Sequence, residues 1–299
     1  MEIQTIRLTE TAQLKTYVPD SEIGYGIHRK RPGILLAPGG AYLIHATRER
    51  EGVALEFLAK GYAVFVLEYS LGFSSREVKE QGAAALDTDA RYPLPVLEMM
   101  EAIHYAKGHC EQLNLDPSRL FLMGFSAGAH VCASCGVFWN SPEFTSRLRF
   151  VPQGDELRVS GMVLCYPLLN PSPEKVLELN DTNNKDARLV KEFLFQTRTP
   201  SQEQLDAVNL VKHVDSFTIP AFLWHSIDDP IVYAVDTTRF VLSLQQHGVN
   251  CEYHLFDKGG HGLGLANAIY AQNEAEVQPD LAVWTELAHK WMERKKQNN

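Results

Sequence analysis

The chain has 299 residues, of which 45% are hydrophobic and 22% are charged, an ordinary composition for a globular protein. This balance excludes a disordered chain, a collagen-like chain and a coiled coil. There are 28 Lys and Arg residues against 37 Asp and Glu residues, giving a formal net charge of −9. A nucleic-acid partner is therefore not expected, because it would need clustered basic residues. A chain of this length can bury a large core, and we expect a single domain over residues 1–299.

The first twenty residues contain no basic region followed by an apolar run, so the sequence does not predict a secretory signal. Residues 120–142 lack charged side chains apart from histidine, but their interspersed Gly, Ser and Asn residues favour a buried strand and helix over a membrane span. The five cysteines are odd in number and scattered, which does not indicate a disulfide framework. Cys132 and Cys135 form a CxxC pair without a second ligand pair, and we expect both to be buried in a helix. These features predict a cytoplasmic protein with no membrane partner and no metal.

Strand-like and helix-like segments alternate along most of the chain. The first twenty residues are typical of antiparallel edge strands. In the helix expected over residues 47–60, Thr47 is the predicted N-cap, Glu49 suits the positive end of the helix dipole and Gly61 ends the helix. Alternation of this kind predicts an α/β fold, with a mostly parallel sheet covered by helices on both faces. The expected strands are 34–37, 62–69, 119–123, 160–166, 221–225 and 251–256, and the expected helices are 47–60, 93–107, 127–139, 233–247 and 281–295.

Residues 170–216 interrupt this alternation. The segment is polar, rich in Asn, Asp and Pro, and contains short helical pieces such as residues 187–196. It is too long for a simple connection between two elements. We interpret it as a lid-like insertion over the top of the sheet, and the alternative is a surface excursion without a role.

The strongest local signal for chemistry is Gly124-Phe125-Ser126-Ala127-Gly128. It follows a strand-like run and precedes a helix, and a nucleophile elbow needs this strand–turn–helix arrangement. The glycines are expected because the turn is tight and side chains there would clash. Ser126 is therefore the candidate nucleophile, with the positive end of the following helix behind it.

A serine nucleophile needs a general base and an acid that orients the base. His261 lies in a glycine-rich loop directly after the strand 251–256 and is the candidate base. Asp228 and Asp229 follow the strand 221–225, and the residues themselves leave the choice between them open. Either choice gives the chain order Ser, Asp, His of an α/β hydrolase. His225 and His130 are expected to be packing or supporting groups.

The run Pro38-Gly39-Gly40-Ala41-Tyr42 follows the strand 34–37 and is the candidate oxyanion hole. Small residues there allow backbone N–H groups to approach a developing negative charge. We assign the donors to Gly40 and Ala41, with Ala127 directly after the nucleophile as the second side of the hole.

The motifs LAPGGAY, GYAVFVLEYSLG, DPSRLFLMGFSAGAH, AFLWHSIDDPIV and KGGHGLGLA resemble those of the α/β-hydrolase superfamily. Within it, the chain is similar to small bacterial carbohydrate esterases such as acetyl and acetylxylan esterases. The resemblance implies serine-dependent hydrolysis of short acyl esters without a cofactor. It places the catalytic aspartate on Asp229, although Tyr233 replaces the usual proline of that loop and Ala41 departs from the usual oxyanion segment.

The leading hypothesis is therefore a carboxylic ester hydrolase whose small-molecule substrate is an acetyl ester of a sugar or xylo-oligosaccharide. An amidase, peptidase or thioesterase would use the same groups, and a binding protein that lost its chemistry is the alternative from another class. The sequence leaves the oligomeric state open.

Overall fold

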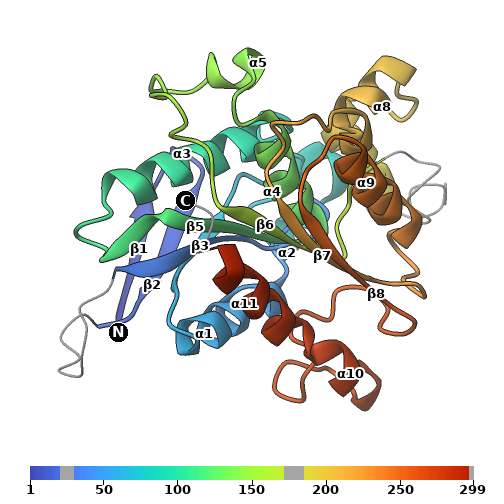
Figure 1. The fold of residues 1–299 in the computed structure, drawn as a ribbon. Coiled ribbons are helices and arrows are strands. Elements are labelled where there is room, and N and C mark those ends of the chain that lie inside the picture. The colour runs from blue at the N-terminus through green and yellow to red at the C-terminus, as the bar shows by residue number, and fades with distance from the viewer. Residues whose placement is uncertain (21–29, 172–184, 296–299) are drawn as a thin grey trace.

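The computed structural model describes residues 1–20, 30–171 and 185–295, and its centre is a sheet of eight strands (Figure 1). The strand order is β1-β2-β4-β3-β5-β6-β7-β8. The first two strands pair antiparallel with each other, β2 pairs antiparallel with β4, and all the other neighbours are parallel. The predicted mostly parallel sheet with antiparallel edge strands is confirmed. The strands are β1 (Glu2–Arg7), β2 (Gln13–Val18), β3 (Arg31–Ala37), β4 (Ala63–Glu68), β5 (Leu115–Phe125), β6 (Gly161–Cys165), β7 (Ala221–Ser226) and β8 (Cys251–Phe256).

Helices cover both faces of the sheet, as the alternation predicts (Figure 1). The helices α3 (Leu94–Gly108), α4 (Ser126–Phe138) and α9 (Ala234–Gln246) pack on one face in a single apolar cluster. On the other face α1 (Glu51–Ala59) and α11 (Trp284–Arg294) form a second cluster. The shorter elements are η1 (Thr47–Glu49), α2 (Arg76–Lys79), η2 (Gly82–Ala85), α5 (Pro142–Thr145), α7 (Lys185–Phe195), α8 (Gln202–Val208), η3 (Leu210–Lys212), η4 (Glu274–Glu276) and α10 (Pro279–Ala282).

Two expectations about helices are wrong in detail. The helix expected over 47–60 is broken at Arg50, whose φ of −114° and ψ of −105° are not helical. Thr47 is not an N-cap but the first residue of the 3-10 helix η1. The break has a tertiary cause, because Glu49 turns inward while the side chain of Arg50 pairs with Glu68 on β4. The closing helix is likewise divided into α10 and α11.

The carboxyl ends of the parallel strands meet at one edge of the sheet, and the loops that follow them therefore come together there. Ser126 follows β5, Tyr166 follows β6, and the two acids Asp228 and Asp229 follow β7. We call residues 38–42, after β3, the oxyanion loop, and residues 257–264, after β8, the histidine loop. The topology brings the predicted site residues to one place.

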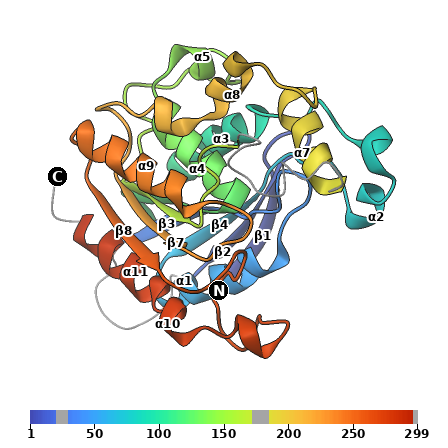
Figure 2. The ribbon, with the colours of Figure 1, turned by 90° about the vertical axis from the view of Figure 1, so that its right-hand side faces the viewer.

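Part of the expected insertion, residues 172–184, lies outside the described residues. The remainder contains α7, α8 and η3, and α7 agrees with the helical piece expected over 187–196. Phe193 of α7 stacks on Tyr42 of the oxyanion loop, with ring centroids 6.0 Å apart and an angle of 27° between the rings. Figure 2 shows α7 and α8 on the side of α3, α4 and α9, and the buried residues of α7 belong to that apolar cluster. Within the described part of the insertion, α7 therefore packs beside the oxyanion loop.

Cys132 and Cys135 are 0% and 1% exposed within α4, as expected, and all five cysteines are free. Among the described residues, no helix combines the length and apolar character that crossing a bilayer requires.

Candidate active site

Ser126 sits at the junction of β5 and α4, at the carboxyl end of a central strand. Its φ is +50°, in the left-handed region that non-glycine residues rarely occupy. Such local strain is found mainly at functional sites, where the surrounding structure enforces it. A Cβ on Gly128 would lie 2.2 Å from the carbonyl oxygen of Ala37, so the helix can approach β3 this closely only with glycine there. The structure thus has the strand–turn–helix geometry predicted from the sequence.

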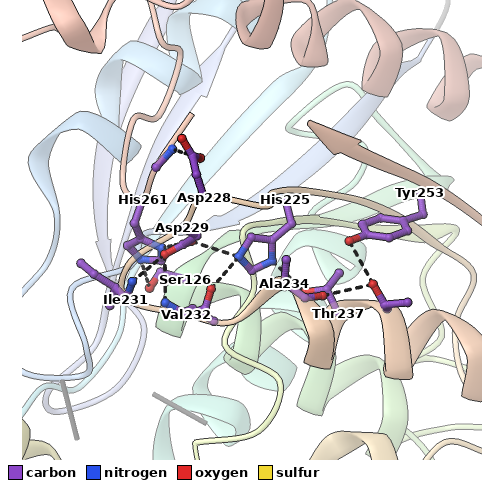
Figure 3. Close-up of polar contacts among 12 residues, drawn as sticks. Ser126, His225, Asp228, Asp229, Ile231, Val232, Ala234, Thr237, Tyr253 and His261 are labelled. Carbon is purple, nitrogen blue, oxygen red and sulfur yellow. Dashed lines mark hydrogen bonds and ion pairs between the residues drawn. The ribbon is translucent and has the colours of Figure 1, made fainter. Parts of the chain in front are cut away.

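His261 joins Ser126 to Asp229 (Figure 3). Its Nδ1 lies 2.6 Å from Oδ2 of Asp229 and its Nε2 lies 2.9 Å from Oγ of Ser126. A carboxylate can only accept, so Nδ1 carries the hydrogen and donates it to Asp229. In the neutral ring Nε2 is then an acceptor, directed at the serine hydroxyl. A general base needs this arrangement to remove the serine proton.

The carboxylate of Asp229 is buried and has hydrogen-bond donors on both oxygens. Oδ1 accepts from the backbone N–H groups of Ile231 and Val232, at 2.8 and 2.9 Å. Oδ2 accepts from His261 and from His225, at 2.6 and 3.0 Å. Burial by itself would raise the pKa of Asp229, but the hydrogen bonds from the two histidines outweigh burial and hold the pKa well below its usual range. Asp229 is therefore ionised at neutral pH.

Asp228 points elsewhere. Its Oδ1 accepts a hydrogen bond of 2.9 Å from the backbone N–H of Gly260, in the histidine loop (Figure 3). Of the two acids that the sequence left open, Asp229 contacts the histidine and Asp228 supports the loop that carries it.

His225 has a more specific place than the sequence suggested. Its Nε2 lies 3.0 Å from Oδ2 of Asp229 and 3.1 Å from the carbonyl oxygen of Val232. Both are acceptors, so Nε2 carries the hydrogen. Its Nδ1 lies 2.8 Å from Oγ1 of Thr237 in α9. Two imidazoles therefore share one carboxylate oxygen, and His225 anchors that carboxylate to α9 (Figure 3).

His130 is fully buried in α4 and its hydrogen bonds go to groups outside the Ser126–His261–Asp229 set. Its Nδ1 lies 2.6 Å from the hydroxyl oxygen of Tyr42, and its Nε2 lies 2.9 Å from the carbonyl oxygen of Val208. Burial lowers the pKa of His130 to about 4. This neutral imidazole supports the structure by linking the oxyanion loop to the end of α8.

The oxyanion loop has an unusual backbone. Gly40, Ala41 and Tyr42 have φ values of +120°, +58° and +63°. The N–H of Gly39 donates to the carboxylate of Glu49 at 2.7 Å and is therefore engaged. Gly40 and Ala41 line the same cleft as Ser126. Ala127 lies in the first turn of α4, where backbone N–H groups have no acceptor within the helix.

A cleft of about 320 Å³ opens above Ser126 and His261. A cavity of this size suits a small organic molecule. Its other lining side chains are a mixture of apolar groups (Leu43, Ile44, Ala46, Ile231) and polar groups (Thr47, Arg48, Glu49, Lys79, Gln272). A larger cavity of about 430 Å³, lined by residues such as Thr11, His45 and Asp87, includes none of the three predicted triad residues. Within the described ranges, no group of three His, Cys, Asp or Glu side chains is arranged to hold a metal.

Two residues at the site were missed by the sequence analysis. The sequence pattern predicts Glu49 as a helix-dipole residue, but its side chain is buried beside the oxyanion loop. Tyr166 was not singled out, although its ring packs edge-on against His261 with centroids 4.9 Å apart. An acidic residue next to two arginines resembles any solvated helix start, so no local signal distinguished Glu49.

Comparison with known proteins identifies the family. The BD-FAE family model matches residues 23–244, well over half of the chain. The chain is 28% identical over 246 residues to endo-1,4-beta-xylanase B of Butyrivibrio fibrisolvens, covering 80% of this chain and 33% of the relative. It is 22% identical over 282 residues to an acetylxylan esterase of Xylanibacter ruminicola, covering 91% of this chain and 48% of the relative. The chain thus spans between a third and a half of the length of these two curated relatives.

Among solved structures, the chain is similar to an acetyl ester-xyloside bifunctional hydrolase from Caldicellulosiruptor lactoaceticus. The TM-score is 0.72 at 27% identity, over 97% of this chain and 96% of the other. The predicted α/β-hydrolase fold and the resemblance to carbohydrate esterases are confirmed.

Proposed function

The chain belongs to the BD-FAE family, and from this membership and the geometry at Ser126 we propose that it is a serine-dependent carboxylic ester hydrolase. The observation that carries the proposal is the position of His261, within hydrogen-bond distance of both the Ser126 hydroxyl and an ionised Asp229. A serine hydroxyl is a weak nucleophile without such a base.

Ser126, His261 and Asp229 have different roles in the proposed cycle. Ser126 Oγ attacks the ester carbonyl while Nε2 of His261 takes its proton, and the C–O bond to the leaving alcohol then breaks as His261 returns the proton to that alcohol. Asp229 stabilises the imidazolium that forms in between. The acyl group stays on Ser126 until a water molecule, deprotonated by His261, attacks it. The bond between the acyl carbon and Ser126 Oγ then breaks, His261 returns the proton to Oγ, and the carboxylic acid is released. No metal or organic cofactor takes part in the proposed cycle.

The negative charge on the carbonyl oxygen needs donors that already point at it. We assign this role to the backbone N–H groups of Gly40, Ala41 and Ala127. Because Glu49 engages the amide of Gly39, the donors on the loop side begin with Gly40.

For the substrate, we propose short acyl esters, with acetyl esters of sugars or xylo-oligosaccharides first. The modest cleft supports a short acyl group, and the names of the relatives, an acetylxylan esterase and an acetyl ester-xyloside hydrolase, support an acetylated carbohydrate. We further propose that the 170–216 insertion shapes this pocket as a lid, because α7 packs on Tyr42 next to the oxyanion loop.

The test combines labelling with a substrate panel. A fluorophosphonate should label Ser126 in the wild-type protein and should not label Ser126→Ala, which we expect to lose ester hydrolysis by on the order of 10⁴-fold while remaining folded. Nitrophenyl esters of increasing acyl length, beside acetylated sugars, amides and thioesters, identify the substrate class. Activity that persists in Ser126→Ala, or that EDTA removes and zinc restores, would contradict the serine mechanism.

A further inference from the structure

Glu49 is a buried carboxylate at the candidate site that has no role in the proposed cycle. The residue is 2% exposed and belongs to η1, on the wall of the cleft. Its Oε2 accepts from the N–H of Gly39 and its Oε1 accepts from the hydroxyl of Tyr166, each at 2.7 Å. Both oxygens thus have donors, the pattern expected of an ionised carboxylate. The nearby Arg48 and Arg50 form ion pairs with Glu276 and Glu68 instead.

Glu49 binds the oxyanion loop directly through Gly39 and reaches the histidine loop through Tyr166. The hydroxyl oxygen of Tyr166 also accepts from the N–H of Gly264, at 3.1 Å, while the Tyr166 ring packs against His261. On the other side, a Cβ on Gly39 would lie 2.8 Å from Oε2 of Glu49 and 2.9 Å from Cβ of Ser126. Gly39 therefore lies between the Glu49 carboxylate and Ser126. The carboxylate is linked to the oxyanion loop and, through Tyr166, to the histidine loop.

The backbone of Tyr166 is strained as well. Its φ of +36° is in the left-handed region, where a residue with a side chain is strained. The surrounding contacts maintain this strain, and their effect is to bring the Tyr166 hydroxyl between Glu49 and Gly264.

A buried charge without an ion pair is an unfavourable way to connect two loops, because removing the charge from water costs free energy. Burial raises the pKa of Glu49 above its usual range, and the hydrogen bonds from Tyr166 and Gly39 and the charges of His261 and Arg48 offset only part of this rise. The other titratable groups facing it are Tyr69 and Cys165. A neutral glutamine could still accept from Gly39 through its oxygen and donate to the Tyr166 hydroxyl through its nitrogen, without that cost. The charge has a use if a positive charge forms beside it, and the imidazolium of His261 is such a charge.

We infer that Glu49 is a positioning residue of the esterase reaction, which fixes the oxyanion loop through Gly39 and stabilises the imidazolium form of His261 by its negative charge. The inference rests on the proposed serine mechanism. Glu49 acts together with Asp229, which contacts the imidazole directly. It also acts together with Tyr166, whose hydroxyl is hydrogen-bonded both to Glu49 in η1 and to Gly264 in the histidine loop.

The test compares Glu49→Gln, which keeps the shape and removes the charge, with Tyr166→Phe, which keeps the charge and removes the hydroxyl. The matched control is Glu98→Gln. Glu98 is also a buried carboxylate, 0% exposed, and its hydrogen bonds come from neutral groups on Thr9, Thr11 and Ser70. It tests what loss of a buried charge does to the fold when the charge is outside the candidate site.

For Glu49→Gln we expect kcat to fall about 10- to 100-fold with KM nearly unchanged, because the lost interactions matter most in the transition state. The acidic limb of the kcat/KM profile should move to lower pH by about half a unit or more, since the imidazolium loses a neighbouring negative charge. Tyr166→Phe should lower kcat with a smaller shift of this limb. Glu98→Gln should change thermal stability while leaving kcat and the limb as in the wild type.

Glu49→Gln that matches the wild type in both kcat and pH profile would overturn the inference while leaving the serine mechanism intact. If that variant does not fold, an unchanged kcat in Tyr166→Phe would overturn it. A folded wild-type protein that neither hydrolyses esters nor reacts with fluorophosphonate would remove the proposed function itself, and the inference with it.

Discussion

Asp228 and Asp229 are adjacent in the loop after β7, but their carboxylates make different contacts. Local composition left Asp228 and Asp229 open, and only the resemblance to esterases favoured Asp229. The structure supplies the physical reason, since the N–H groups of Ile231 and Val232 hold Oδ1 of Asp229 while Asp228 turns to Gly260. Backbone donors across a turn leave little trace in the sequence. For the same reason, the sharing of Asp229 by two histidines was not predicted.

The two acids give a matched pair of variants. We expect Asp229→Asn to lower kcat by about 10⁴-fold, because an amide does not stabilise the imidazolium and favours the wrong tautomer of His261. Asp228→Asn should cost about tenfold or less, since it disturbs only the hydrogen bond to Gly260. Both are measured at one pH above neutrality. A severe loss in Asp228→Asn with a mild loss in Asp229→Asn would reverse the assignment.

His225 should matter for stability as well as activity. His225→Phe keeps a buried ring of similar size but removes a donor to the ionised Asp229, and we expect the free energy of unfolding at pH 7 to fall by about 2 kcal/mol or more. Urea denaturation measures this change. Thr237→Val is the control, because it removes the partner of Nδ1 and leaves the bond between His225 and Asp229 in place. Equal losses of unfolding free energy in the two variants would show that the bond to Asp229 contributes no more to stability than the bond to Thr237.

At the level of the elements, periodicity located most helices and strands but failed where a tertiary contact decides the local structure. The segment 47–60 has the apolar spacing and the end signals of one continuous helix. The structure interrupts it at Arg50, because Glu49 must face Gly39 and Tyr166, one of them more than a hundred residues away in the sequence. A helix pattern carries no information about such distant partners. The missed helix break and the missed site residue therefore have one cause.

The insertion is the element whose role is least visible in the sequence, and α7 offers a test of it. Phe193 is fully buried against Tyr42, and Phe193→Ala should weaken the packing of α7 by about 3 kcal/mol. Hydrogen exchange of the α7 amides should then accelerate by about 100-fold, while that of α4 stays slow. If the insertion is a lid, KM for acetylated sugars rises more than kcat falls. Lys191→Ala in the same helix is the control, and a KM unchanged from the wild type in Phe193→Ala would contradict the lid.

On the scale of the whole molecule, the alternation of elements was sufficient to predict the sheet and its two layers of helices. The observed order of the strands places the loops after β3, β5, β7 and β8 at one edge, where ligands bind in α/β proteins in general. The three triad candidates come together because of this topology, although Ser126 and His261 are far apart in the sequence. The fold and the triad candidates were therefore predictable, whereas the groups that hold the triad in place depend on packing.

The same packing predicts how the protein responds to acid. His130 is buried between Tyr42 and Val208, and burial lowers its pKa from the ordinary value of about 6.5 to about 4. Between these two values the unfolded chain binds a proton that the folded chain does not, so stability falls as the pH is lowered. The stabilising effect of the neutral imidazole is complete above about pH 6.5 and is lost progressively toward pH 4. At pH 5 the loss from this one group is about 2 kcal/mol.

This loss can be measured by urea denaturation of the wild type and His130→Gln at pH 7.5 and pH 5. The glutamine variant should be less stable at pH 7.5, because an amide fits the Tyr42 and Val208 contacts less well. Its stability should nevertheless fall by about 2 kcal/mol less than that of the wild type between the two pH values, since the group can no longer take up a proton. His247→Gln replaces an exposed imidazole at the end of α9 and is the control, expected to keep the pH dependence of the wild type. The same fall in stability in His130→Gln and the wild type would show that the proton taken up on acid unfolding belongs to other groups.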